Sequence, residues 1–458
     1  MSTDPQGGER HDGALGALVR ALGCSYEETF SIASGSIPSL QNQPFASNRP
    51  LGSYDFLIGP LLYADTLREA EAFARASGVA PHEALLALGW ITADDYAALL
   101  GAALGLEVIA NRPFRLLRRR PSTRSILTDG VLASAVIGEV EGQSRLLLDC
   151  TAFSPDAINE LMARPDLTAW PPVLVTRRGL AEAILRGEKQ ALIGAAVWGH
   201  ARNRPLQSAA FGVPLRQALK IAVATGLVIG AAAVVPGAAI AVSTALLTLP
   251  FLAIVGLRSA SLPAVFRRTK PPPVALEASV PSDAELPAYT VLVALYREAA
   301  VLAQLVAALS GLDYPKAKLD IKLVLEEVDA ETRRAAAKLN LPAYFEIIVV
   351  PNAAPRTKPK ALNFALPFAR GQYLVIFDAE DIPEPDQLRK AVAAFQRGPA
   401  ELVCLQARLG IYNWRLNWLT RQFAIEYTAL FDAILPTLAR LGLPLPLGGT
   451  SNHFNGIA

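Results

Sequence analysis

Residues 373–381 read Tyr-Leu-Val-Ile-Phe-Asp-Ala-Glu-Asp, five apolar residues followed by three carboxylates within four positions. An apolar run of this kind is typical of a strand buried on both faces of a parallel sheet. Ligands of open α/β sheets bind beyond the carboxyl ends of the strands, so Asp378 and Glu380 stand where a divalent cation and a phosphorylated ligand could meet. The alternative is that these carboxylates only solvate the end of a strand.

From Tyr289 onward, strand-like and helix-like patterns alternate along the chain. Short runs rich in β-branched and apolar residues are separated by segments whose apolar residues have helical spacing. This alternation predicts right-handed crossover connections and a parallel sheet with helices on both faces, an α/β fold. The expected strands lie within residues 290–296, 321–327, 344–351, 373–381 and 401–409.

Charged side chains directly follow several of these strands. Parallel strands share one direction, so their carboxyl ends meet at one edge of the sheet and the charged clusters should converge there. One such cluster would be ordinary solvation, but four in sequence predict a polar cleft. The clusters are Arg297-Glu298; Glu326, Glu327 and Asp329; Lys358 and Lys360; and Asp378, Glu380 and Asp381.

The composition limits the classes of protein to consider. A chain of 458 residues favours two or three domains, and a formal charge of +2 gives no argument for nucleic-acid binding. Three cysteines, far apart and odd in number, indicate a reducing compartment rather than a disulfide framework. The four histidines are equally scattered and form no zinc-binding spacing.

Between Lys220 and Arg258 lie 37 residues without a charged side chain. A spanning helix needs about 20 apolar residues, so this run suits two passes, with Pro236-Gly237 at the turn. Basic residues on both flanks predict that both ends lie in the cytoplasm, in a multi-pass protein whose large segments face the cytoplasm. The alternative is a buried helical hairpin within a large soluble core.

Residues 81–106, PHEALLALGWITADDYAALLGAALGL, have helical periodicity, and Thr92 is placed to N-cap a helix. This segment, with the strand and helix patterns of 126–187, resembles the N-terminal domain of type II secretion ATPases. Some relatives of that domain bind cyclic di-GMP through an Arg-Leu-Gly opening and a repeated Leu-rich motif; here the unit occurs once, without that opening. We favour a protein-docking module, with a cyclic dinucleotide site as the alternative. The chain has no P-loop, so the resemblance implies no ATPase activity.

Six segments after Tyr289, in this order, resemble glycosyltransferase family 2, in its bacterial membrane branch related to cellulose synthase-like enzymes. The resemblance covers about 170 residues and implies a GT-A-like fold, a nucleotide-sugar donor, in particular a UDP-sugar, and transfer of a hexose with inversion. It also implies the bacterial inner membrane as the location. The segments are LYRE (295–298), LVLEEVDAET (323–332), RTKPKALNFAL (356–366), FDAEDIPEP (377–385), LQARL (405–409) and GGTSNHF (448–454).

The resemblance implies donor-binding roles for the strand-end residues. The tyrosine and glutamate after the first strand would line the nucleotide pocket, the acids after the second would contact base or ribose, and a lysine would lie near the diphosphate. The branch usually has two adjacent aspartates where Val328-Asp329 stand, so one carboxylate for base recognition is missing. The implied donor-binding residues are Tyr296, Glu298, Glu326, Asp329, Lys358 and Asp378.

Asp378 and Glu380 occupy the family's DxD positions, with Glu in place of the second Asp. The resemblance implies that both bind Mg²⁺ or Mn²⁺ and that, with Asp381, they are the catalytic carboxylates. A divalent cation between carboxylates and phosphate oxygens stabilises the charge that grows on a diphosphate leaving group. Asn452 and His453 would lie on the acceptor side, and a structural hydrogen-bonding role is the alternative for His453.

An inverting transfer also needs a general base to deprotonate the acceptor hydroxyl. In the family this base is a later Asp, followed by a Gln-x-x-Arg-Trp segment and further membrane helices. The sequence reaches Ala458 before either of these. We therefore expect a C-terminally truncated enzyme whose general base is not present in the chain. The competing hypothesis is a non-catalytic, membrane-associated binding or docking protein.

Residues 413–447 intersperse aromatic residues such as Trp414, Trp418 and Phe423 with charged ones. This pattern predicts an amphipathic helix at a membrane surface or, equally, an ordinary core-packing helix. The expected organisation is a disordered lead (1–54), a small helical domain (55–120), a small α/β domain (121–200), two transmembrane helices (215–258), a Pro-rich linker (259–288) and an incomplete GT-A-like glycosyltransferase domain (289–458).

Overall fold

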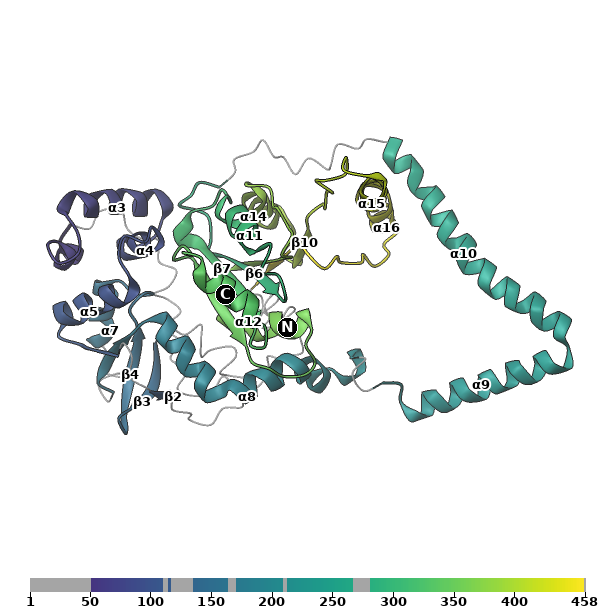
Figure 1. The fold of residues 1–458 in the computed structure, drawn as a ribbon, viewed down its shortest axis with the longest axis horizontal. Helices are drawn as coiled ribbons and strands as arrows, with labels where there is room; N and C mark the ends of the chain where they lie inside the picture. The colour runs from purple at the N-terminus through teal and green to yellow at the C-terminus, as the bar shows by residue number, and fades with distance from the viewer. Residues whose placement is uncertain are drawn as a thin grey trace, which may run out of the picture. The chain divides into compact units, whose positions relative to one another are not determined.

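The structure is a computed structural model that describes residues 51–109, 114–116, 135–163, 170–208, 212–266 and 281–456. The lead expected over 1–54 lies almost entirely outside the described residues, as does half of the expected linker. The chain divides into two compact units. The first comprises Met1–Asn203, Ser279–Leu405 and Asn452–Ala458, and the second comprises Arg204–Ala278 and Gln406–Ser451. Figure 1 shows the elements of both.

The first unit begins with short helices packed around buried aromatic rings. They are η1 (Leu51–Leu57), α3 (Ala64–Ser77), α4 (Pro81–Ala87) and α5 (Ala93–Leu104). Thr92 N-caps α5 as predicted, because its hydroxyl accepts the N–H of Asp95 at 3.1 Å. The imidazole of His82 stacks on the ring of Tyr96 at 5.2 Å and is hydrogen-bonded to the Tyr54 hydroxyl at 2.9 Å.

A five-stranded mixed sheet follows, in the order β1-β5-β4-β3-β2. β1 and β4 run parallel to β5, while β2, β3 and β4 are antiparallel neighbours. The strands are β1 (Glu107–Ile109), β2 (Arg115–Leu116), β3 (Ala135–Val140), β4 (Gln143–Asp149) and β5 (Pro172–Val175), with helix α7 (Pro155–Met162) between β4 and β5.

The second sheet has the order β10-β11-β9-β6-β7-β8. Strands β9, β6, β7 and β8 are parallel, as predicted, with β8 at one edge, and β7 is buried along its whole length. Beyond β9 the sheet continues with β11, which pairs antiparallel with β9, and the other edge is β10, which has only three residues. The strands are β6 (Tyr289–Leu295), β7 (Leu319–Glu326), β8 (Phe345–Val350), β9 (Tyr373–Phe377), β10 (Cys404–Gln406) and β11 (Asn452–Asn455).

Helices α11 (Leu302–Ser310), α12 (Ala330–Lys338), α13 (Lys358–Ala365) and α14 (Gln387–Arg397) connect these strands. α13 packs beside the long helix α8 (Arg177–Asn203), which starts after β5. Leu192 and Ala196 of α8 share a hydrophobic core with Phe364 of α13 and Leu292 of β6. Helix α8 therefore packs against both sheets of the first unit.

The second unit contains two long apolar helices, α9 (Leu215–Val234) and α10 (Pro236–Phe266). The chain turns between them at Val235-Pro236, close to the predicted Pro236-Gly237 turn. Residues 215–234 and 236–263 are long and apolar enough to cross a membrane, a test of length and composition only. The unit also contains α15 (Trp418–Ala429), the π-helical segment η8 (Leu430–Ile434) and α16 (Leu435–Arg440); α10 packs against η8 and α16.

The described chain thus has the fold class that the sequence predicted. It is a mixed α/β structure with parallel strands in both sheets, and two apolar helices precede the larger sheet. The antiparallel strand β11 is the difference. No strand was predicted over residues 452–455, because four residues are too few for a period-2 pattern and their partners in β9 lie 76 or more residues away along the chain.

Candidate functional site at the strand ends

The parallel pairing of β6, β7 and β9 brings their carboxyl ends to one edge of the sheet. Leu295, the last residue of β6, is in register with Leu325 of β7, and Val293 of β6 is in register with Phe377 of β9. The residues that follow are those singled out from the sequence: Tyr296, Arg297 and Glu298 after β6, Glu326, Glu327 and Asp329 at and after the end of β7, and Asp378 after β9.

Asp378 forms an ion pair with Lys358 directly beyond β9. The Nζ atom of Lys358 contacts Oδ1 of Asp378, and each side chain is about one third exposed. Lys358 is held there because Thr357 caps the start of α13, accepting the N–H of Lys360 at 3.4 Å. A lysine ammonium and a partly exposed carboxylate opposite it suit a phosphate with a bound cation, because the ammonium attracts phosphate oxygens and the carboxylate is a ligand for a divalent cation.

The other two acids of this stretch lie differently. The N–H of Asp378 donates to Oδ2 of Asp381 at 2.7 Å, and the N–H of Asp381 donates back to the carbonyl of Asp378 at 3.2 Å. Asp381 thereby closes the turn that holds Asp378 at the strand end. Glu380 is exposed. The structure therefore brings Asp378, Asp381 and Lys358 together, with Glu380 at the surface beside them.

Asp329 links the loops that follow β6 and β7. Its Oδ1 accepts the N–H of Thr332 at 3.1 Å, which caps α12, and its Oδ2 accepts the N–H of Arg297 at 2.5 Å. The Thr332 hydroxyl accepts the N–H of Glu298 at 3.1 Å. Arg297 has φ +63°, a left-handed conformation that non-glycine residues rarely adopt, and these hydrogen bonds hold it. The loop that carries Tyr296 and Glu298 is thus fixed by Asp329.

The charge state of Asp329 follows from these contacts. Burial raises its pKa, but the hydrogen bonds from Arg297 and Thr332 outweigh burial and leave the pKa below its usual value. Asp329 is therefore ionised at neutral pH. Thr332 was not predicted as a partner of this loop, although the spacing Asp329-x-x-Thr332 at a helix start is a capping signal that could have indicated it.

Glu326 has a buried partner. Nζ of Lys360 lies 2.8 Å from Oε1 of Glu326, and the two side chains are 1% and 6% exposed. Removing one partner of such a pair leaves an uncompensated buried charge, so loss of either side chain should destabilise the fold around α13. The structure gives Glu326 this structural role, and its assignment to the donor stays a prediction.

Asn452 and His453 lie within strand β11, where His453 is in register with Val375 of β9. His453 is 2% exposed; its Nδ1 lies 2.6 Å from the Tyr289 hydroxyl and its Nε2 lies 3.1 Å from Nε2 of Gln387. The Gln387 amide nitrogen is a donor, so Nε2 accepts and Nδ1 carries the proton. Burial lowers the pKa of His453 to about 4, which keeps the ring neutral. This environment is that of a structural hydrogen-bonding histidine.

The carboxylates at the end of β9 fit a divalent cation that a substrate completes. No cluster of three or more His, Cys, Asp or Glu side chains in the described residues is arranged to hold a metal ion. Mg²⁺ is, however, usually bound through one or two carboxylates together with substrate phosphates. Asp378 and Glu380 can supply such a partial set of oxygen ligands. The structure itself shows no complete metal site among the residues it describes.

A family model and several known proteins are similar to part of this chain. Residues 290–450 match the model of the family "Glycosyl transferase family 2". The chain is 31% identical over 138 residues to the beta-monoglucosyldiacylglycerol synthases of Trichormus variabilis and of Nostoc sp.. The match covers 30% of this chain, and the chain spans only 29% of the length of these curated relatives.

Two solved structures are also similar over part of the chain. A mannosyltransferase from Pyrobaculum calidifontis in complex with GDP-Man and Mn²⁺ shares 25% identity, with a TM-score of 0.25 over 36% of this chain and 50% of that one. S. aureus TarS in complex with UDP-GlcNAc shares 22% identity, with a TM-score of 0.22 over 24% of this chain and 31% of that one. Residues 290–450 of the chain therefore match glycosyl transferase family 2, the family whose motifs the sequence resembles.

Proposed function

We propose that the region from Tyr289 onward is a glycosyltransferase that binds a UDP-sugar with Mg²⁺ or Mn²⁺ and transfers the hexose, with inversion, to an acceptor hydroxyl. The family match over residues 290–450 and the relatives named as glucosyl-lipid synthases support this activity. The observation that carries the proposal is the convergence of Tyr296, Asp329, Lys358 and Asp378 at one sheet edge, through the contacts described above.

Each residue has a role that follows from its position. Tyr296 is 41% exposed and would offer its aromatic ring to a nucleobase, while the guanidinium of Arg297 already lies over one face, 5.2 Å from the ring centroid. Asp329 would accept hydrogen bonds from the base or the ribose. Glu298, whose backbone N–H donates to the Thr332 hydroxyl, would do the same. These assignments agree with those implied by the family motifs.

The Lys358–Asp378 ion pair provides the diphosphate site. When a donor binds, the ammonium of Lys358 would turn to the diphosphate, where it would stabilise the negative charge on the leaving group. Asp378 would then be free to act as a ligand of the cation, together with Glu380, while Asp381 holds the turn. A divalent cation supplies Lewis-acid stabilisation of the departing diphosphate.

Two further parts of the proposal concern the rest of the chain. We propose that α9 and α10 cross the bacterial inner membrane and that the large segments face the cytoplasm; their length and apolar composition support this. We also propose that the helices and sheet of residues 55–200 form a docking module for a protein partner, with a cyclic dinucleotide as the alternative ligand, following the resemblance to secretion-ATPase N-terminal domains.

Calorimetry of the purified full chain tests the donor site. UDP should bind in the presence of Mn²⁺, and Asp378→Asn should weaken this binding at least tenfold, about 1.4 kcal/mol, because one cation ligand is lost. Asp386→Asn is the matched control, since Asp386 follows the same strand but pairs with Lys390 at the surface. Absence of metal-dependent binding by the unaltered chain, or equal weakening by both variants, would refute the donor site.

Turnover separates the enzyme from the non-catalytic alternative. The chain reconstituted in lipid vesicles would be supplied with a radiolabelled UDP-hexose and Mn²⁺, and the label would be followed into products. Transfer of label that Asp378→Asn abolishes supports the enzyme. Donor binding without any transfer would instead support the hypothesis of a binding or docking protein.

A further inference from the structure

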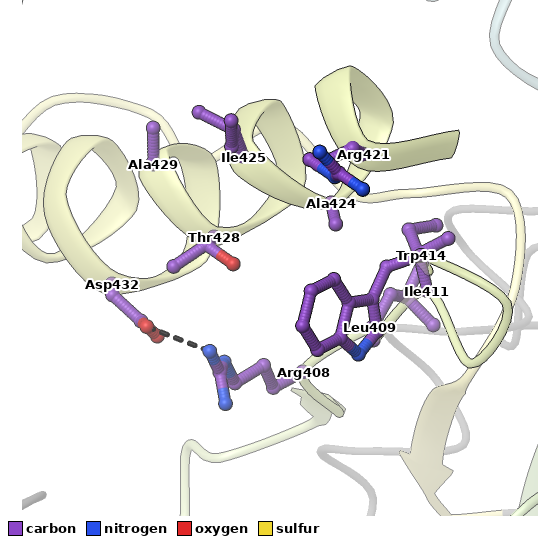
Figure 2. A pocket seen from close by; sticks show the side chains of 11 residues that line it. Arg408, Leu409, Ile411, Trp414, Arg421, Ala424, Ile425, Thr428, Ala429 and Asp432 are labelled. Carbon is purple, nitrogen blue, oxygen red and sulfur yellow. Dashed lines mark hydrogen bonds and ion pairs between the residues drawn. The ribbon is translucent and has the colours of Figure 1, made fainter. Parts of the chain in front are cut away.

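The second unit contains an open groove of about 620 Å³ with mostly apolar walls. One wall is formed by α15 and the start of η8, and the other by the loop of residues 408–414 that follows β10. In Figure 2, Trp414 of the loop lies below the helical wall, from which Ala424, Thr428 and Asp432 project toward it. All of these residues belong to the same compact unit.

The helical wall is a single face. Its members, Arg421, Ala424, Ile425, Thr428, Ala429 and Asp432, are spaced by three and four residues, which aligns them along one side of a helix. The small side chains of Ala424 and Ala429 leave room in the middle of this face. The charged residues Arg421 and Asp432 stand at its two ends.

The two ends differ in charge. At one end Nη2 of Arg408 lies 2.7 Å from Oδ2 of Asp432, so the charges there are balanced. At the other end, we find no ion pair for the guanidinium of Arg421 within the part of the chain that the structure describes. The groove therefore combines apolar walls with one cation, Arg421, that has no ion-pair partner among the described residues. A ligand with an anionic group and an apolar chain would complement both features.

The side chains around the groove are exposed and largely apolar. No residue of α15 is buried, and Trp418, Leu419 and Phe423 are 70%, 56% and 46% exposed. This exposure is unlike that of a core-packing helix. The apolar helix α10 packs against η8, directly beyond the groove wall, in the same unit. Exposed apolar and aromatic side chains beside a long apolar helix indicate a segment that lies in the interface of a bilayer.

We propose that this groove binds an anionic phospholipid of the bilayer. The phosphate would contact Arg421, and the first part of an acyl chain would lie along Ile411 and Trp414 of the loop. A basic residue near an anionic membrane surface contributes about 1 kcal/mol, so loss of Arg421 should reduce the affinity for the anionic lipid about fivefold. The inference goes beyond glycosyl transfer and rests only on the membrane-anchoring part of the proposed function.

Trp414 itself provides the readout. The full chain would be placed in lipid discs with Trp90, Trp170, Trp198 and Trp418 replaced by phenylalanine, so that Trp414 is the one remaining tryptophan. Phosphatidylglycerol with brominated acyl chains quenches tryptophan on contact and would be titrated against brominated phosphatidylcholine at the same mole fraction. We expect the anionic lipid to quench Trp414 at lower mole fractions.

Matched variants separate the groove from general surface charge. Arg421→Gln should shift the phosphatidylglycerol titration about fivefold, whereas Arg440→Gln, which removes the same charge from α16 outside the groove, should not shift it. Ala424→Phe, which fills the groove and keeps its charge, should reduce quenching by both lipids.

Three outcomes would overturn the proposal. They are equal quenching by the two lipids, equal shifts for Arg421→Gln and Arg440→Gln, and disulfide trapping of two copies through Thr428→Cys, which would identify a second copy of the chain as the occupant. Calorimetry with UDP and Mn²⁺ on the Arg421→Gln variant distinguishes this failure from that of the donor site, because Arg421 lies outside that site.

Discussion

At the scale of single residues, one buried carboxylate is paired with cations, and two buried histidines are kept neutral by burial. Asp320 shows the first case. Nζ of Lys322 and Nε of Arg370 each lie 2.8 Å from Oδ1 of Asp320. Burial raises the pKa of Asp320, but these two cations outweigh burial and lower the pKa below its usual value. His82 and His453 show the second case, since burial lowers the pKa of both below 6.5. These opposite solutions have different consequences for the pH dependence of stability.

The neutral histidine in β11 predicts a loss of stability on acidification. His453 has a pKa of about 4 in the folded chain and about 6.5 when unfolded, so the unfolded chain binds the extra proton between these values. Its contribution is fully present above pH 6.5 and falls as the pH falls toward 4. Between pH 7.5 and 5 the loss is about 2 kcal/mol, or several degrees in the unfolding midpoint.

Thermal unfolding of the full chain at these two pH values checks this prediction. His453→Gln should unfold with a smaller pH dependence than the unaltered chain, because the titrating ring is gone. An identical dependence for the unaltered chain and His453→Gln would show that folding does not lower the pKa of His453.

The sequence located the residues of the candidate site but not their partners. Asp378 and Asp329 could be placed at strand ends because an apolar run followed by a charge is a local signal, and Lys358 could be placed in the loop before a helix. The pairs Lys358–Asp378 and Glu326–Lys360 join residues 20 and 34 positions apart, and the pairing of Tyr289 with His453 joins residues 164 apart. Such pairs depend on the order of the strands in the sheet, which periodicity does not encode.

At the scale of elements, helix α8 connects the two sheets of the first unit. The strand and helix patterns predicted from the sequence end at residue 187, whereas α8 (Arg177–Asn203) continues well beyond it. Its second half packs on α13, and Nδ2 of Asn363 donates to the carbonyl of Ala196 at 3.2 Å. Nζ of Lys189 lies 3.7 Å from Oε1 of Glu327, the residue that follows β7. The long-range packing partner of a helix is not visible in its own sequence.

This packing predicts that α8 stabilises the helix that carries Lys358. Leu192 is 3% exposed in the core shared with α13, so Leu192→Ala should cost about 2–5 kcal/mol and loosen α13. Hydrogen exchange of residues 358–365 should accelerate in this variant. Leu161→Ala is the control, because Leu161 is equally buried but lies in the core around α5 and α7, which excludes α13.

The two variants should also differ in donor binding. Leu192→Ala should weaken the binding of UDP and Mn²⁺ because Lys358 is held by the first turn of α13, whereas Leu161→Ala should leave that affinity unchanged. Unchanged exchange of α13 in Leu192→Ala would mean that α13 is held by its own sheet and that α8 contributes nothing to the candidate site.

At the scale of the whole molecule, the apolar hairpin was the easiest feature to predict and its role in a membrane is the strongest test of the proposed function. Its signal is a long uncharged run with basic flanks, which needs no tertiary information. The packing of α10 on η8 and α16 was beyond the sequence, because these segments lie far apart in the chain. The hairpin and the segment that forms the proposed lipid groove belong to the same compact unit.

A hairpin that crosses the bilayer twice predicts opposite labelling of its flanks and its turn. With Cys24, Cys150 and Cys404 replaced by serine, single cysteines would be introduced as Gln207→Cys and Ser282→Cys on the flanks and Gly237→Cys at the turn, where an added side chain meets no atom within 4 Å. An impermeant maleimide should label both flanks in inside-out vesicles and the turn only in right-side-out vesicles, because basic residues retain both flanks in the cytoplasm. Labelling of all three cysteines from one side would show that the hairpin does not cross the bilayer. The donor site would then have to reach its acceptor without the anchoring that we propose for α9 and α10.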